Sequence, residues 1–475
     1  MLLHSYERDV DDSKALETKA PSRSDEAETE SSGAAFVCAK PSSVVARGVA
    51  VFEKSCEGTG EVEPPAVVLG GGVSGLAVIR ALGRRGVPSL VICPLESGAA
   101  RSRWARPLGE IPVDASALHR ALDDAGVRGA VLFPASDEWA TAISRSERSE
   151  RPSVVPSEHA IQTLTDKAQF AALAAQLDIP HPRSIAIDGV ADLRRLSMAE
   201  LRRYFLKPVD SQRFATTFGR KGIWAADPSA SVVLERAIEM KLKLLLQEYV
   251  ASDAGAHIFL DGYVARDGRV LAVYARRRLR MFPPDFGNST LSEIIPLDHA
   301  ATARKSLQRI FDGISFSGGL FDAEFVRDPH SGSFQLLEVN ARAWWQLALA
   351  AHAGADVCWL AYLDALDEKV GFADVEPRGQ RWVHAVYDAS AWLTEIRTTS
   401  RSPGGAPPFA WRGAVDAVFA RDDLGPARAF LEGRRIYDIP AALIARRRRT
   451  AESRSFLPPL SDSLELVAGE MRESE

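Results

Sequence analysis

The chain has 475 residues, of which 46% are hydrophobic and 25% are charged, and its formal net charge is −5. This balance supports several packed cores, and it excludes a wholly disordered chain, a collagen-like repeat and a disulfide scaffold. The four cysteines form no CxxC pair, so the sequence indicates neither a zinc knuckle nor a redox dithiol and favours a reducing, cytoplasmic location.

The negative charge is concentrated near the N-terminus. Residues 1–63 carry 13 acidic and 7 basic side chains, a net charge of −6, and the remaining residues together carry +1. Because this segment is rich in Ser, Glu and Asp and has little periodicity, we expect a disordered acidic extension. The near-neutral remainder does not predict a nucleic-acid surface. The most apolar stretch, residues 343–363, is interrupted by polar residues and does not predict a membrane span.

An alternation of apolar runs and glycines opens the ordered part of the chain. The apolar run 66–69 is followed by Gly70-x-Gly72-x-x-Gly75, then by a helical pattern and a second apolar run at 89–93. This order predicts a β-loop-α-β unit in a Rossmann-like N-terminal domain over residues 64–155, with a further strand at 153–155. An NAD or FAD oxidoreductase is one alternative, but it requires an acid where the second run ends in Cys93 and Pro94.

Further strands and one long helix are expected downstream. Apolar runs predict strands at 204–207 and 243–250, and the Asp267-Gly268 turn predicts a hairpin that joins 257–264 to 269–276. The region 343–366, rich in Ala, Leu and Trp, predicts a helix.

A second hairpin, residues 319–342, carries the most informative acidic residues. A turn at 328–333 places Glu324 nearly opposite Glu338, on the face that also carries Asn340 and Arg342. Two opposed carboxylates repel each other unless a cation lies between them, and Mg²⁺ prefers carboxylate and amide oxygens. The pattern therefore favours a magnesium site over the alternative, a polar sheet surface that faces solvent.

Two lysines and one strand end carry weaker signals. Lys167 begins a predicted helix and Lys207 ends a strand, and either could neutralise phosphates, although each alone is typical of a surface lysine. The backbone of residues 247–250 could present a donor and an acceptor to a purine edge, with the acid Asp253 close behind.

Taken in order, these segments resemble the ATP-grasp superfamily, in particular its carboxylate–amine ligase branch and the D-aspartate-ligase-like members. The resemblance covers roughly residues 66–365 and includes the Ser136-Asp137 loop. The matching stretches are Thr165-Asp166-Lys167, Leu206-Lys207-Pro208, Gln247-Glu248-Tyr249-Val250, Phe321-Asp322-Ala323-Glu324-Phe325 and Leu337-Glu338-Val339-Asn340-Ala341-Arg342.

The resemblance implies an α/β and α+β chain, with a Rossmann-like N-terminal domain followed by a two-subdomain ATP-grasp fold. The ATP-grasp domain would span residues 156–368 with a break near residue 250, and residues 369–475 would form a C-terminal extension of open role. The implied cofactors are ATP and Mg²⁺, with two ions usual in the family and Mn²⁺ as a chemical substitute.

Residue roles follow from the same resemblance. Those roles are phosphate binding for Lys167 and Lys207, adenine contact for Gln247, Glu248 and Val250, ribose contact for Asp253, metal binding for Glu324, Glu338 and Asn340, catalysis for Arg342 and Lys207, and contact with the acid substrate for Arg276, Arg278 and Arg280. The loop at 210–222 departs from the family pattern, because it carries bulky residues where glycine and serine usually cover the phosphates.

The function expected from the resemblance is an ADP-forming ligase that joins a small-molecule carboxylic acid to an amine. The expected partners are these two substrates, without nucleic acid or membrane, and a homodimer is compatible with the resemblance. The alternatives are a catalytically silent ATP-binding regulatory protein, the oxidoreductase named above, and a biotin-carboxylase-like activity, for which the chain shows no biotin-carrier segment.

Overall fold

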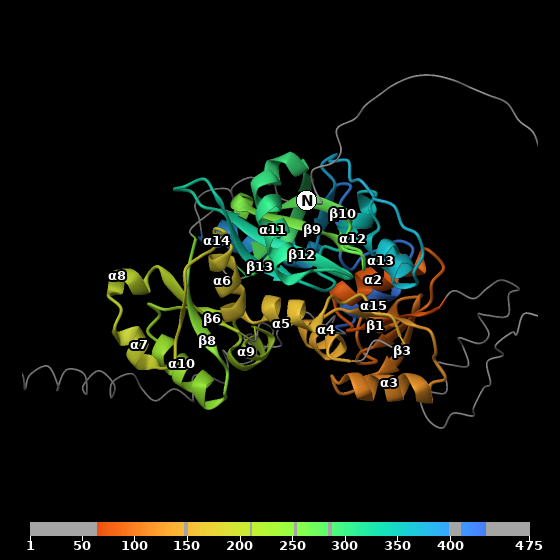
Figure 1. Ribbon diagram of the computed structural model, residues 1–475, viewed down its shortest axis with the longest axis horizontal. Coiled ribbons are helices and arrows are strands. Elements are labelled where there is room, and N and C mark those ends of the chain that lie inside the picture. Colours follow the sequence, from red (N-terminus) through yellow and green to blue (C-terminus); the bar gives the residue numbers. More distant parts are fainter. Residues whose placement is uncertain are drawn as a thin grey trace, which may run out of the picture.

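The computed structural model describes residues 64–146, 151–209, 211–250, 254–283, 287–398 and 410–433. Three β-sheets, each with its own helices, make up this part of the chain (Figure 1). The expected disorder of residues 1–63 and the ribose contact of Asp253 lie outside the described residues. None of the described helices is both long enough and apolar enough to cross a membrane.

The N-terminal sheet is parallel, with the strand order β3-β2-β1-β4. Its strands are β1 (Ala66–Leu69), β2 (Ser89–Ile92), β3 (Ala105–Gly109) and β4 (Val131–Pro134), and its helices include α2 (Val73–Gly83), α3 (Ala115–Asp124) and α4 (Asp137–Ser144). This is the strand order of one half of a doubly wound sheet, and the predicted β-loop-α-β unit is confirmed. The strand expected at 153–155 is reduced to a single bridge between Leu132 and Ser153.

The small sheet is antiparallel, with the order β5-β8-β6-β7. Its strands are β5 (Ser184–Ala186), β6 (Tyr204–Pro208), β7 (Ile223–Trp224) and β8 (Leu244–Glu248), and the helices beside it are α7 (Val190–Arg194), α8 (Met198–Leu201), α9 (Ser211–Phe218) and α10 (Ala230–Glu239). Leu206, Phe214, Leu234 and Leu246 form the centre of its core. Two helices, α5 (Glu158–Thr165) and α6 (Lys167–Gln176), connect it to the N-terminal sheet.

The large sheet has seven strands in the order β13-β12-β9-β10-β11-β14-β15. Five of its strands are β9 (His257–Val264), β10 (Val270–Phe282), β11 (Asn288–Ile295), β12 (Gly319–Arg327) and β13 (Phe334–Asn340), which is the edge strand, and α11 (Ala301–Ile314) joins β11 to β12. Both predicted hairpins are present. Glu324 pairs with Glu338, which confirms the register derived from the turn, and Asp322 pairs with Asn340.

The helix expected over 343–366 is divided into two. These are α12 (Ala348–His352) and α13 (Val357–Ala365). Gly354 lies between them with φ +103°, a conformation that L side chains rarely adopt, and the Asp356 side chain caps α13 by accepting from the backbone N–H of Trp359. Glycine and aspartate therefore end one helix and begin the next, although the apolar composition predicted a single helix.

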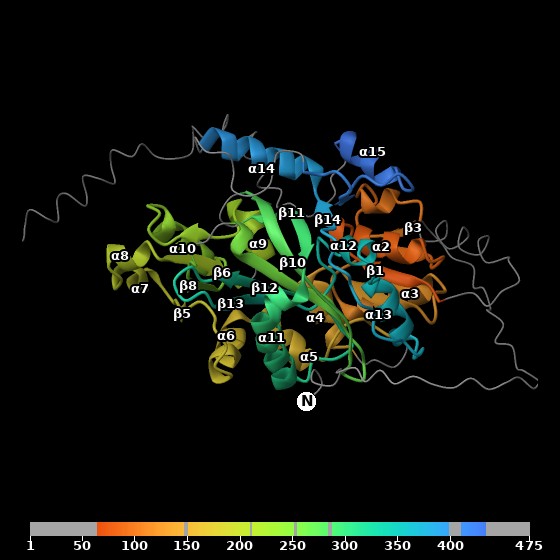
Figure 2. The same ribbon diagram turned by 90° about the horizontal axis from the view of Figure 1, so that it is seen from above.

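Part of the C-terminal extension belongs to the large sheet. Strand β14 (Arg381–Val383) pairs with β11, and β15 (Val415–Asp416) pairs with β14. Helix α14 (Ala385–Thr398) follows β14, and α15 (Gly425–Leu431) lies beside the N-terminal domain (Figure 2). Strand pairing thus continues the large sheet beyond residue 368, and the domain boundary expected there stays a prediction.

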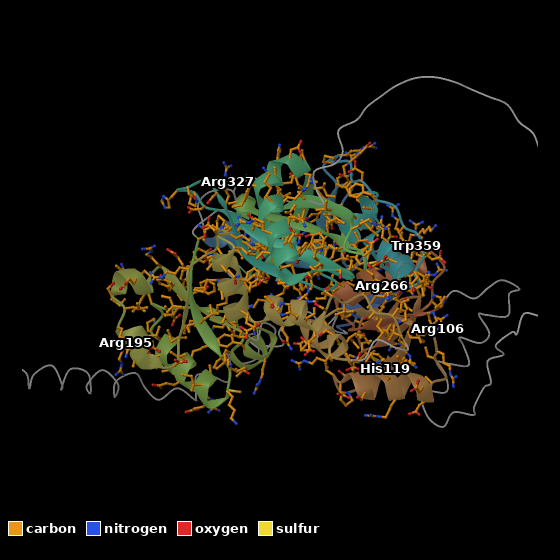
Figure 3. The ribbon with its side chains drawn as sticks, viewed as in Figure 1. Arg106, His119, Arg195, Arg266, Arg327 and Trp359 are labelled. Atoms are coloured by element: carbon orange, nitrogen blue, oxygen red, sulfur yellow. The ribbon has the colours of Figure 1, made fainter. Side chains whose placement is uncertain are left out.

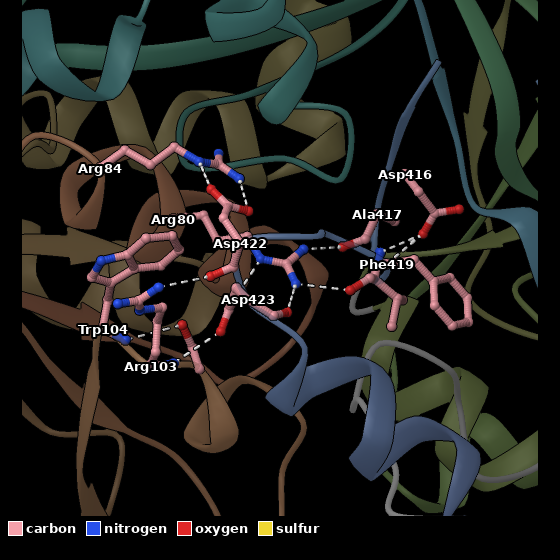
Figure 4. A network of polar contacts seen from close by, with 11 residues as sticks. Arg80, Arg84, Arg103, Trp104, Asp416, Ala417, Phe419, Asp422 and Asp423 are labelled. Atoms are coloured by element: carbon pink, nitrogen blue, oxygen red, sulfur yellow. Dashed lines mark hydrogen bonds and ion pairs between the residues drawn. The ribbon is translucent and has the colours of Figure 1, made fainter. Parts of the chain in front are cut away.

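A buried ion pair fastens this C-terminal segment to the N-terminal domain (Figure 4). Arg80 of α2 contacts Asp423 at 3.0 Å and also donates to the carbonyl of Val418 at 2.8 Å. The second Asp423 oxygen accepts from the backbone N–H of Arg103 at 2.9 Å. Residues about 340 positions apart in sequence thus hold one side of the molecule together.

Because removal of one partner leaves a buried charge without compensation, we expect Asp423→Ala to lower the free energy of unfolding by about 3–5 kcal/mol. The adjacent Asp422 is the matched control, since its pair with Arg84 is largely exposed, with 46% of the Asp422 side chain accessible. Asp422→Ala should cost no more than about 1 kcal/mol. Urea unfolding of both variants measures the difference, and equal losses of unfolding free energy would contradict a stabilising role for the buried pair of Arg80 and Asp423.

Candidate functional site

One large cleft lies among the three sheets, with a volume of about 1250 Å³. Gly70 and Asp137 line it from the N-terminal domain, Lys207 from the small sheet, and Glu338 and Arg342 from the large sheet and its end. In Figure 3, Arg195 of the small subdomain and Arg106 of the N-terminal domain lie at opposite ends of the molecule, with the large sheet between them. Each wall of the cleft therefore comes from a different unit.

The cleft brings together most of the residues singled out in the sequence. Those that line it are Lys167, Lys207, Gln247, Glu248, Val250, Arg276, Arg278, Glu324, Glu338, Asn340 and Arg342. Arg280 lies outside it, and Asp253 lies outside the described residues.

The opposed carboxylates Glu324 and Glu338 differ in their surroundings. Glu324 Oε1 accepts from Arg278 Nη2 at 2.8 Å and from the Nδ1–H of His257 at 2.8 Å. Burial by itself would raise the pKa of Glu324, but Arg278 and His257 outweigh burial and hold that pKa well below its usual range. No hydrogen-bond donor of the described residues contacts the Glu338 carboxylate.

This donor set fits a hard cation only in part. The described residues contain no cluster of three or more His, Cys, Asp or Glu side chains placed to hold a metal ion. Two carboxylates and the Asn340 amide oxygen leave several coordination positions to other oxygens. Mg²⁺ has this requirement, because it usually keeps waters and phosphate oxygens among its ligands.

Arg342 forms a two-point contact with Asp137 of the N-terminal domain. Its Nε donates to Asp137 Oδ1 at 2.9 Å and its Nη2 to Oδ2 at 3.3 Å, and Nη2 also reaches Asn340 Oδ1 at 3.3 Å. Burial would raise the pKa of Asp137, but Arg342, helped by Lys167, lowers it. Asp137 was noticed in the sequence only through the Ser136-Asp137 loop, and the structure adds its contact with Arg342.

Lys167 and Lys207 face the acidic pair from the small-sheet side of the cleft. Lys207 Nζ donates to Gln247 Oε1 at 2.8 Å, and Gln247 Nε2 donates to Ser184 Oγ at 3.1 Å. Burial and the nearby charge of Lys167 lower the pKa of Lys207 to about 8, against the attraction of Glu338 and Glu324. Two amines and two carboxylates therefore share one partly desolvated space.

The strand end expected to contact adenine has its own protein partners. The backbone N–H groups of Glu248 and Tyr249 donate to the carbonyls of Arg183 and Arg203, each at 2.8 Å. The Glu248 carboxylate forms an ion pair with Arg203. Phe205 and Tyr249 meet edge to face with ring centroids 6.3 Å apart, and both line the cleft. This end of the cleft thus has an aromatic wall beside Val250.

The segment at 210–222 begins with a helix, α9, instead of a glycine-rich loop. After the helix, Lys221 lines the cleft, and its Nζ donates to Asn288 Oδ1 on β11 at 2.5 Å. The segment in which the family usually binds phosphates through backbone N–H groups thus makes a side-chain contact with the large sheet here. Whether this segment covers phosphates stays a prediction.

The arginines expected to contact the acid substrate already have partners within the protein, and their contact with a substrate stays a prediction. Arg276 has a fully buried side chain whose Nε and Nη2 donate to Asp261 at 2.6 Å and to Asp322 at 2.7 Å. Arg278 donates to Glu324 and to Ser289 Oγ. Both guanidinium groups are therefore occupied by the wall of the cleft itself, because the large sheet carries acids directly beside them.

Arg280 belongs to a different cluster, behind the cleft. Its Nη1 donates to Asp388 of α14 at 2.5 Å, and both side chains are 1% exposed. The same carboxylate accepts from Thr290 Oγ1 and from Trp411 Nε1. A bulge in the pairing of β10 with β11 lies next to Arg280 and interrupts the alternation of side chains along β10. Arg280 therefore attaches α14 to the sheet.

The C-terminal segment also supports one end of the cleft. Trp345, which lines the cleft, stacks on Tyr387 of α14 with ring centroids 6.2 Å apart, and His384 lies 4.1 Å from Tyr387. Burial lowers the pKa of His384 to about 4, so this imidazole is neutral at pH 7. The contact between Trp345 and α14 gives part of the C-terminal extension a place behind the site.

Sequence reasoning missed the contributions of His257 and Asp261, and it gave Asp322 no role of its own. Their signal was alternation: His257, Phe259 and Asp261 occupy one face of β9, and Asp322 and Glu324 occupy the same face of the neighbouring strand. Without knowledge that β9 and β12 are neighbours, this pattern resembled scattered polar residues.

No protein-family model matches the chain, and no curated protein matches it. Among solved structures, biotin carboxylase from Campylobacter jejuni in complex with βγ-ATP is similar over 64% of this chain and 71% of its own, with 14% identity and a TM-score of 0.50. Carboxyaminoimidazole ribonucleotide synthase from Aspergillus clavatus in complex with ATP is similar over 66% of this chain and 80% of its own, with 15% identity and a TM-score of 0.52.

A third similar structure is the biotin carboxylase domain dimer of 2-oxoglutarate carboxylase from Hydrogenobacter thermophilus, with MgADP, ADP and bicarbonate. It is similar over 65% of this chain and 71% of its own, with 16% identity and a TM-score of 0.51. These similarities, together with the observed sheets, confirm that the chain has the ATP-grasp fold.

Because burial and Lys167 depress the pKa of Lys207, its amine should lose its proton near pH 8, whereas an exposed lysine does so near pH 10.4. Reductive ¹³C-methylation and NMR titration measure this directly, and Lys207→Arg assigns the signal by its disappearance. Because the folded pKa is lower than the unfolded one, this lysine destabilises the fold as the pH falls from about 10.4 to about 8; the effect is absent above that window and constant below it. A Lys207 signal that titrates above pH 10 would contradict the burial argument.

Proposed function

We propose that the protein is an ATP- and Mg²⁺-dependent ligase that activates a small-molecule carboxylate as an acyl phosphate and joins it to an amine, with release of ADP and phosphate. One observation carries the proposal: the opposed pair Glu324 and Glu338 shares a cleft with the amines of Lys167 and Lys207 and with the guanidinium of Arg342. Alternating positive and negative groups of this kind suit a polyphosphate and its cation.

The lysines and the acidic residues of the cleft would have complementary tasks. Lys167 and Lys207 would neutralise nucleotide phosphates. Burial and the charge of Lys167 lower the pKa of Lys207, and a bound phosphate would favour its protonated form. Glu324, Glu338 and Asn340 would hold magnesium, which when bound withdraws charge from phosphate oxygens. The aromatic wall of Phe205 and Tyr249 would then adjoin the base.

Arg342 would stabilise the charge that develops during phosphoryl transfer. Its contacts with Asp137 and Asn340 fix the guanidinium plane before any substrate binds, so little reorganisation remains at the moment of reaction. Positioning and charge neutralisation would provide most of the rate enhancement, as in other phosphoryl transfers.

The names of the similar structures support the nucleotide part of this proposal, since they describe proteins in complex with ATP, an ATP analogue or MgADP. One of them is described as a domain dimer, which supports a homodimer here as a proposal. The D-aspartate-ligase-like branch, the acid and the amine stay predictions from the sequence.

A catalytically silent ATP-binding protein is the second candidate. It is favoured by the arginines of the cleft wall, because Arg276, Arg278 and Arg342 all have carboxylate partners from the protein itself. In that case the nucleotide would bind without turnover.

Glu338→Gln should reduce ADP formation at least about 10²-fold, because it removes one of two carboxylates that would offset the charge of the cation. The assay measures ADP release from ATP and Mg²⁺ in a panel of carboxylic acids combined with amines. Glu293→Gln is the control: Glu293 lies on β11 of the same sheet, pairs with Arg277 and Arg381, and is absent from the cleft wall.

Full turnover by Glu338→Gln would contradict the proposed metal role. ADP and ATP binding by the wild-type protein without turnover for every acid and amine pair would favour the silent regulatory protein instead.

A further inference from the structure

We propose that Asp322, held by the buried Arg276, is a positioning residue that turns the amide oxygen of Asn340 towards the cation site. The inference depends on the proposed function, since it concerns the binding of magnesium. It assigns Arg276 a task inside the wall of the cleft, in place of the substrate contact expected from the sequence.

Strand register places Asp322 next to Asn340. Asp261 on β9, Asp322 on β12 and Asn340 on β13 form one cross-strand row, since Asp322 pairs with both of the others. Glu324 and Glu338 form the next row, two residues further along β12. Two residues along a strand correspond to about 7 Å. The Asn340 amide thus stands beside the opposed carboxylates on the same face.

Hydrogen bonds set the direction of the Asn340 amide. Asn340 Nδ2 donates to Asp322 Oδ2 at 3.1 Å, and Asn340 Oδ1 accepts from Arg342 Nη2 at 3.3 Å. An ionised carboxylate can only accept hydrogen bonds, so Asp322 bonds the NH₂ group of the amide and rejects its oxygen. The oxygen is thereby directed away from Asp322, and a flipped amide would place two acceptors against each other.

Arg276 in turn holds Asp322 in place. Arg276 Nη2 donates to Asp322 Oδ1 at 2.7 Å, and Arg276 Nε donates to Asp261 Oδ2 at 2.6 Å. The guanidinium carbon lies 3.7 Å from the centroid of the Phe259 ring, and the side chain is fully buried. A planar cation fixed by two carboxylates and one ring has little freedom, so each oxygen of Asp322 has a defined task.

Substitution of Asp322 should change the affinity of the site for a metal ion. Partners that orient metal ligands typically change metal affinity by about 10–100-fold when they are substituted. Asp322→Asn keeps the shape of the side chain but can bond either end of the Asn340 amide, so the orientation is no longer enforced. The loss should appear in metal affinity, whereas a merely structural role would change stability alone.

Mn²⁺ replaces Mg²⁺ as a paramagnetic probe of the proposed site. The EPR signal of free Mn²⁺, recorded in the presence of ADP, measures how much of the ion is bound. We expect Asp322→Asn to weaken Mn²⁺ binding by about 10–100-fold and to leave the affinity for ADP without metal within about twofold. Glu293→Gln should bind Mn²⁺ like the wild type. Asp261→Asn disturbs Arg276 but retains the hydrogen bond between Asp322 and Asn340, so it should lower thermal stability and weaken Mn²⁺ binding less than Asp322→Asn does.

A double-mutant cycle separates orientation from charge. In an Asn340→Asp background both oxygens of residue 340 are equivalent, so adding Asp322→Asn should cause no further loss of Mn²⁺ affinity. Asp322→Ser, which also accepts either end of an amide, should repeat the effect of Asp322→Asn if that variant folds poorly. Thermal unfolding of each variant reports its stability.

Wild-type Mn²⁺ affinity in Asp322→Asn and Asp322→Ser, or an equal loss in the Asn340→Asp background, would overturn the positioning role. Wild-type protein that binds neither ADP nor Mn²⁺ would instead remove the proposed function, together with this inference. The two failures are therefore distinguishable.

Discussion

Repulsion among carboxylates on one face of the large sheet is the constraint on which the site depends. Asp261, Asp322, Glu324 and Glu338 lie on adjacent strands, and their charges must be offset by cations or removed by protonation. Burial, together with the neighbouring Asp322, raises the pKa of Asp261 well above its usual value despite Arg276. The protein supplies Arg276 between Asp261 and Asp322, and Arg278 and His257 beside Glu324. Glu338 lies near the charges of Lys207 and Arg342, but its carboxylate accepts no hydrogen bond from the described residues, which leaves its oxygens available to a bound cation.

The same principle relates the three sheets. Arg342, at the end of the large sheet, contacts Asp137 of the N-terminal domain, and the small sheet presents Lys207 to the acidic row. Away from the cleft, Arg80 and Asp423 join the N-terminal domain to the C-terminal segment, whose helix α14 supports Trp345. Charge pairs between distant segments therefore act beside apolar cores that the N-terminal sheet and the large sheet share, whereas the small sheet has a core of its own.

Local patterns made much of the fold predictable. The Gly70–Gly75 loop between two apolar runs predicted the first β-α-β unit, and the turn after Arg327 fixed the pairing of Glu324 with Glu338, because a short turn leaves few registers. The division of the 343–366 region at Gly354 was less visible, since apolar composition alone does not report where a backbone needs positive φ. The continuation of the large sheet into β14 was also hidden, because that pairing joins residues about 90 positions apart.

The sequence by itself determined that Glu324, Glu338, Asn340 and Arg342 share one face of a hairpin, since alternation and turn position depend only on neighbours along the chain. The family resemblance, and not the alternation, added Lys167 and Lys207 as candidates for the same site. Only the tertiary structure decided what Arg276, Arg278 and Arg280 contact, because their partners come from other strands and from α14. The sequence alone does not show whether a charged side chain contacts a ligand or a carboxylate of the protein, because the strand order determines which residues are its neighbours.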